Sequence, residues 1–193
     1  MVFSFFIRSE FPFRLVAVAA LFLPAWIFSQ NLQLLSDLGK IFPASELVRS
    51  TVLFCFAGTF SGIGMAIFYR RHLGISFFPY SFHLFVIVAA LIGCTEEIVF
   101  RGFLQDQVKS INGPFSILFS TISHTAYKCC LFLSPMVTGG IDIRFLAVWT
   151  FSGGILLGTI KHFSKSILPP IIAHMLFDIM VYAGFVNPPW WVW

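Results

Sequence analysis

Charged residues are scarce in this sequence. Only 10% of its 193 residues are Asp, Glu, Lys or Arg, whereas 58% are hydrophobic. The mean hydropathy of the chain is +0.90. Soluble globular domains carry roughly 25% charged residues, so this shortage excludes an ordinary soluble domain. The composition predicts a protein that needs lipid as its solvent.

Cysteine is also sparse, and its placement excludes two kinds of site. Cys55, Cys94, Cys129 and Cys130 all fall in apolar stretches, and no pair of them has Cys-x-x-Cys spacing. Neither a disulfide framework nor a thiolate zinc site is therefore indicated. We expect these cysteines to be small packing residues inside the bundle.

Long apolar stretches account for most of the chain, and each is close to the ~20 residues that cross a bilayer as a helix. They lie at roughly 13–29, 50–69, 80–104, 114–134, 145–161 and 167–186. This pattern predicts an all-α fold, a polytopic transmembrane helical bundle of about six spans. Since six spans and their connections use the whole length, we expect one integral membrane domain over residues 1–193.

Two Gly-x-x-x-Gly spacings fall within these stretches, from Gly58 to Gly62 and from Gly154 to Gly158. Small residues at this spacing let helices approach closely in lipid, where packing takes the place of the hydrophobic effect. We expect both pairs to face neighbouring helices.

The third stretch carries charges that hydropathy does not favour, at Glu96, Glu97 and Arg101. An ionised group at the bilayer centre costs roughly 3 kcal/mol or more, which usually indicates a functional site. Glu97 and Arg101 are i, i+4 neighbours and should pair, which leaves Glu96 as the freer base. The alternative is a helix end that reaches the headgroups, since Gln105, Asp106 and Gln107 follow.

The fourth stretch carries a polar stripe of Ser120, His124 and Lys128 at i, i+4 spacing. Such a stripe on an apolar helix usually faces the interior of a bundle. A single histidine on an apolar helix is more often a hydrogen-bonded structural residue than a catalytic one. His124 becomes a candidate because acidic groups are expected on the neighbouring helix.

The sixth stretch presents His174 and Asp178 on one helical face, after Pro169-Pro170. Three helices therefore each offer acid or base groups. Peptide hydrolysis needs a base for water and donors for the developing oxyanion, and these residue types suit both tasks. The sequence thus predicts a water-activating site at membrane depth.

These motifs resemble the CPBP family, the CAAX-protease and bacteriocin-processing group of intramembrane glutamic endopeptidases. The resemblance rests on Glu-Glu-x-x-x-Arg at 96–101, a histidine on the next helix, and His-x-x-x-Asp at 174–178, and it covers roughly residues 80–186. It implies a protease whose catalytic residues are Glu96 and His124 for water activation, Glu97 and Arg101 for support, and His174 and Asp178 for the oxyanion. It implies no cofactor.

The chain departs from the family pattern at two positions. Ser120 occupies the Phe position of the usual Phe-x-x-x-His motif, so the register around His124 is open, with His162 as the other candidate. Asp178 stands where many members have Asn, and an ionised Asp would repel an oxyanion. Either Asp178 is protonated in its apolar setting, or it only orients His174.

Two other functions fit the same residues. Glu96, His124 and His174 could bind zinc in an intramembrane metalloprotease, since two His and one carboxylate form a catalytic zinc set. Alternatively, a non-enzymatic immunity or assembly factor, or a channel, could use intramembrane charges without cutting a bond. Chelator sensitivity separates the metalloprotease from the glutamic mechanism.

The resemblance leaves three substrate classes open: prenylated CAAX tails, peptide precursors and C-terminal sorting signals. Each implies a membrane-anchored or lipidated protein or peptide as the partner. We expect membrane lipid around the chain and no nucleic acid. The net charge of +4 suits a multi-pass protein in a bacterial or archaeal inner membrane, next to anionic lipid.

Overall fold

A computed structural model describes Val16 and residues 45–133 and 142–185, and all the regular secondary structure in these ranges is helical. This confirms the all-α class. In chain order the elements are α4 (Ser45–His72), α5 (Phe85–Glu97), the π-helix η2 (Ile98–Leu104), α6 (Gln105–Val108), α7 (Gly113–Leu133), α8 (Ile143–Ser164) and α9 (Leu168–Tyr182).

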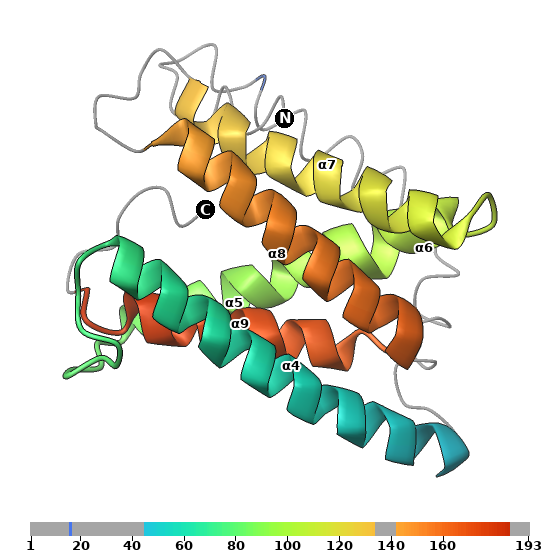
Figure 1. Ribbon diagram of the computed structural model, residues 1–193, viewed down its shortest axis with the longest axis horizontal. Helices are drawn as coiled ribbons and strands as arrows, with labels where there is room; N and C mark the ends of the chain where they lie inside the picture. Colours follow the sequence, from blue (N-terminus) through green and yellow to red (C-terminus); the bar gives the residue numbers. More distant parts are fainter. Residues whose placement is uncertain (1–15, 17–44, 134–141, 186–193) are drawn as a thin grey trace.

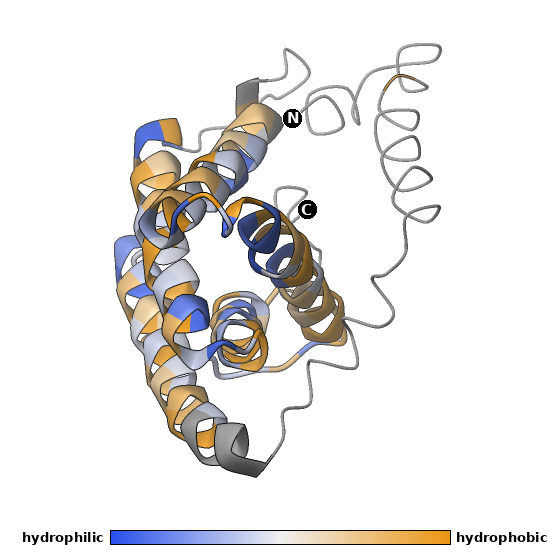
Figure 2. Cartoon of the chain, turned by 90° about the vertical axis from the view of Figure 1, so that its right-hand side faces the viewer, coloured by the Kyte–Doolittle hydropathy of each residue, from blue (hydrophilic) through white to orange (hydrophobic). Residues whose placement is uncertain are grey.

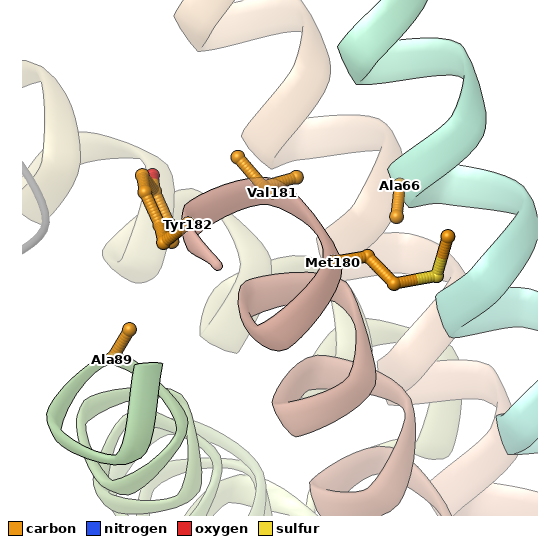
Figure 3. Packing of buried hydrophobic residues seen from close by; sticks show 5 residues of the cluster. All are labelled: Ala66, Ala89, Met180, Val181 and Tyr182. Carbon is orange, nitrogen blue, oxygen red and sulfur yellow. The ribbon is translucent and has the colours of Figure 1, made fainter. Parts of the chain in front are cut away.

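Helix α9 forms the centre of the packing. It contacts α4 along one side and α5 along another, while α7 packs against α8, and α8 also contacts α4 and α9 (Figure 1). A hydrophobic cluster of Ala66, Ala89, Met180, Val181 and Tyr182 joins α4, α5 and α9 (Figure 3). The element that carries His174 and Asp178 is therefore held from several sides.

Two described helices are long and apolar enough to cross a membrane, at Thr51–His72 and Ile143–Ser164. Helix α9 is apolar but has only 15 residues. The predicted stretch at 13–29 lies outside the described residues except for Val16. The structure therefore supports two candidate spans, and about six spans stays a prediction.

Helix α7 places its polar side chains inside and its apolar ones outside. Its buried residues include Ser116, Ser120, Thr121 and His124. Its exposed residues include Phe115, Leu118, Phe119 and Ile122. Figure 2 likewise shows hydrophilic residues interrupting helices that are mostly hydrophobic. This distribution confirms that the stripe containing Ser120 and His124 faces the interior, and it suits a helix surrounded by lipid.

Gly58 and Gly62 of α4 face the backbone of α9. A Cβ atom on Gly58 would collide with the carbonyl oxygen of Pro169, and one on Gly62 would collide with that of Ala173. The expectation of close approach at this Gly-x-x-x-Gly pair is confirmed, because only hydrogen fits between the two helices.

Both ends of α9 are fixed. The helix begins at Leu168, so Pro169 and Pro170 lie within its first turn rather than ahead of it. N–H groups in the first turn have no partner within the helix, so the two prolines cost no helical hydrogen bond. At the other end, Nη1 of the buried Arg70 donates to the carbonyl oxygen of Met180 at 2.5 Å. A cation at this end also complements the helix dipole.

The close contact between α4 and α9 predicts different outcomes for two glycines of one helix. Gly62→Ala should lower the free energy of unfolding by about 1–3 kcal/mol, since the added methyl group overpacks the interface with Ala173. A Cβ atom on Gly64 would meet nothing within 4 Å, so Gly64→Ala is the matched control. It should be neutral or stabilise by up to ~1 kcal/mol. Thermal unfolding in detergent measures both, and equal midpoints would contradict this packing.

Candidate active site

The helix that carries the paired glutamates changes its geometry directly after them. Helix α5 ends at Glu97, and the π-helix η2 follows with Phe100 and Arg101 buried inside it. Ser120 Oγ donates to the carbonyl oxygen of Phe100 at 2.6 Å, which ties η2 to α7. Short π-helical segments occur frequently at functional sites, because they redirect side chains and free carbonyl groups.

Glu97 and Arg101 form the predicted i, i+4 ion pair. The Arg101 Nη1 to Glu97 Oε1 distance is 3.0 Å, and the two side chains are 1% and 0% exposed. His174 Nδ1 lies 2.8 Å from the same carboxylate oxygen. Glu97 therefore joins η2 to α9 by accepting hydrogen bonds from both.

His124 lies between Arg101 and Glu96. Its Nδ1 is 2.8 Å from Arg101 Nη1, and its Nε2 is 3.1 Å from Glu96 Oε2. Because a guanidinium can only donate, Nδ1 must accept, so Nε2 carries the hydrogen and donates to Glu96. The ring of Phe100 stacks on the imidazole with centroids 4.4 Å apart and holds its plane.

The other histidine considered for this motif lies elsewhere. The ring of His162 occupies the space beside Gly113, where a Cβ atom would meet it at 2.6 Å. It also packs edge-on against Phe163. The structure thus places His124, and not His162, beside Glu96.

Glu96 has a counter-ion that lies on another helix. Lys128 Nζ forms an ion pair with Glu96 Oε1, reaching it from α7. The sequence analysis missed this contact because it considered only cations on the same helix. The polar stripe of α7 contained the signal, since Lys128 stands one turn after His124 on the same face.

His174 and Asp178 complete the cluster from α9. His174 Nε2 lies 3.8 Å from Glu96 Oε2 and 3.8 Å from Asp178 Oδ2. A Cβ atom on Gly93 would collide with Asp178 Oδ2 and would lie 3.1 Å from His174 Cδ2. Sequence reasoning missed Gly93, although its place about one turn before Glu96 is the available signal.

A cavity of about 90 Å³, partly open to the surroundings, lies against this cluster. Its polar lining includes Arg101, His124, Lys128, His174 and Asp178. Its apolar lining includes Met65, Tyr69, Leu146, Trp149 and Phe177, contributed by α4, α8 and α9. The arrangement can place an apolar chain beside acid and base groups.

No three His, Cys, Asp or Glu side chains in residues 45–133 and 142–185 are arranged to hold a metal ion. Zinc binding by Glu96, His124 and His174 would require His124 to give up one of its two ring hydrogen bonds. The four cysteines are free, and each is partly buried.

A family described as type II CAAX prenyl endopeptidase Rce1-like matches residues 78–180, slightly more than half of the chain. No curated protein and no solved structure matches the chain. The matched range contains the whole cluster from Glu96 to Asp178 and begins and ends close to the predicted core of 80–186.

The buried pair of Glu97 and Arg101 makes a prediction about stability. Arg101→Gln should lower the free energy of unfolding by about 3–5 kcal/mol, because it leaves the Glu97 carboxylate buried without a counter-ion. Arg71→Gln removes the same charge from an exposed position of α4 and should change the free energy of unfolding by no more than ~0.5 kcal/mol. Unfolding of both purified variants in detergent gives the comparison, and similar small losses would contradict the pairing.

Proposed function

Since the chain belongs to the Rce1-like family of type II CAAX prenyl endopeptidases, we propose that Glu96 is the base that activates water in this peptide-bond hydrolase. The observation that carries the proposal is the contact of 3.1 Å between Glu96 Oε2 and His124 Nε2, beside the cavity. The family assignment favours an enzyme over the non-enzymatic immunity or assembly factor. It also implies a membrane-embedded protein that acts on a membrane-associated protein substrate.

The first chemical step is deprotonation of water. Glu96 Oε2 and His174 Nε2 are 3.8 Å apart, so a water that contacts both atoms would lie to one side of the line between them. Glu96 takes one proton from this water, and the hydroxide attacks the carbonyl carbon of the scissile peptide bond. His124, fixed as the Nε2–H tautomer by Arg101, orients the Glu96 carboxylate by donating to it.

The second step is stabilisation and collapse of the tetrahedral intermediate. His174 already donates its Nδ1 hydrogen to Glu97, so only a protonated imidazolium can donate from Nε2 to the oxyanion. Asp178 Oδ2 lies 3.8 Å from that nitrogen and orients the imidazolium rather than contacting the oxyanion. The C–N bond then breaks, and the leaving amine takes the proton that Glu96 carries.

The cavity supports a prenylated CAAX tail as the substrate. Tyr69, Trp149 and Phe177 give it an apolar wall that can receive a lipid-like chain while the peptide lies near His174. A peptide precursor or a sorting signal would present a peptide without a prenyl group. Multi-pass topology and a bacterial or archaeal source stay predictions.

Three substitutions test the assignment of the catalytic groups. Glu96→Gln, His124→Ala and His174→Ala should each lower kcat for a farnesylated CAAX peptide by at least about 100-fold, the usual contribution of acid–base groups. His162→Ala removes an imidazole outside the cluster and should leave kcat unchanged. Cleavage is followed by mass spectrometry in detergent or liposomes, with the same peptide lacking the prenyl group as a second substrate.

The outcomes separate the possibilities. Full cleavage by Glu96→Gln would exclude Glu96 as the base. Equal cleavage of the prenylated and unprenylated peptides would argue against the prenyl chain as a recognised group. Loss of cleavage in His162→Ala as well would mean that the assay does not single out His124 as the catalytic histidine.

The glutamic mechanism also predicts the response to chelators. We propose that no metal participates, because the hydrogen bonds among Glu96, His124 and Arg101 already occupy both ring nitrogens of His124. A strong zinc chelator should therefore leave the cleavage rate of the purified enzyme within about twofold of the untreated rate. Loss of activity that added zinc restores would support the metalloprotease alternative with Glu96, His124 and His174 as ligands.

A further inference from the structure

The two oxygens of the Glu96 carboxylate have different partners. Oε1 forms an ion pair with Lys128, whereas Oε2 faces His124 at 3.1 Å and His174 at 3.8 Å. The oxygen assigned to water activation is therefore the one that Lys128 does not hold. The proposed mechanism assigns no role to Lys128.

One face of α7 contacts both oxygens of this carboxylate. His124 and Lys128 are four residues apart, so both project from the same side of α7 toward α5. Ser120, one turn earlier, anchors the same face to η2 through the carbonyl oxygen of Phe100. The predicted polar stripe of α7 thus makes one contact with η2, through Ser120, and two contacts with Glu96, through His124 and Lys128.

Lys128 also compensates the charge of Glu96. The Glu96 and Lys128 side chains are 7% and 14% exposed, so neither charge is well solvated. Glu97 has Arg101 as its counter-ion from the same stretch of helix. Within the described residues, Glu96 has no counter-ion on its own helix, and Lys128 supplies one from α7.

We propose that Lys128 is a positioning residue for the hydrolysis reaction. Its ammonium group fixes Oε1 and compensates the charge of Glu96, which directs Oε2 toward His124 and the attacking water. This inference rests on the proposed function, because it presumes that Glu96 is the base. It goes beyond that function by giving a role to a residue outside the Glu96, His124 and His174 set.

The kinetic test compares two ion-paired lysines whose own side chains are mostly buried. Lys128→Met should lower kcat for the farnesylated peptide by at least about tenfold, with KM within about twofold, because the base loses its orientation and not its substrate. Lys128→Arg keeps the charge and should recover part of kcat. Lys161→Met is the control, since Lys161 pairs with Asp106 away from the cavity and its side chain is 7% exposed.

Unfolding measurements keep the test decisive if Lys128→Met folds poorly. Lys128→Met should lower the unfolding midpoint of the wild type, but it should not lower that of Glu96→Gln, where no charge remains to compensate. Equal losses in both backgrounds would overturn the proposal, because Lys128 would then stabilise the fold independently of Glu96.

Failure of this inference and failure of the proposed function give different results. If Glu96→Gln is inactive while Lys128→Met keeps the wild-type kcat, only the role of Lys128 is wrong. A rise in KM at constant kcat would also overturn the role, since it would make Lys128 a substrate-binding group. If Glu96→Gln cleaves like the wild type, the proposed function itself fails.

Discussion

The buried ion pair of Glu97 and Arg101 is the interaction on which the cluster depends. Both side chains are almost completely buried, and each has a second partner: Arg101 donates to His124, and Glu97 accepts from His174. The pair thus sets the orientation of two imidazoles on two other helices. Removing either member would leave one charge uncompensated in the bundle and would also release one histidine.

Close helix packing makes this network possible. On α8, a Cβ atom on Gly154 would lie 2.7 Å from Thr121 Cγ2 and 3.2 Å from Arg101 Nη2, so it would collide with Thr121 and crowd the guanidinium. On α5, Gly93 makes the same kind of space for Asp178 and His174. A polar cluster in an apolar bundle must be this compact, because buried polar groups are costly unless they find partners.

The sequence predicted the members of the cluster better than its connections. Hydropathy located the helices, and i, i+4 spacing predicted the pairing of Glu97 with Arg101, because both signals act within one helix. The contact of Lys128 with Glu96 joins two helices, and spacing within one helix does not reveal it. The sequence analysis also missed the π-helix at Ile98–Leu104, because an apolar run has the same sequence pattern in α and π geometry.

Hydrogen-bond direction gives the two adjacent glutamates different chemistry. Arg101 can only donate, and His174 donates its Nδ1 hydrogen, so Oε1 of Glu97 is engaged by two donors in a fully buried position. Glu96 has one oxygen held by Lys128, while the other contacts His124 Nε2 at 3.1 Å and lies 3.8 Å from His174 Nε2. Glu97 is thus suited to fix the site and Glu96 to exchange a proton. Although the residues are identical and adjacent in sequence, their partners on α7 and α9 support separate roles.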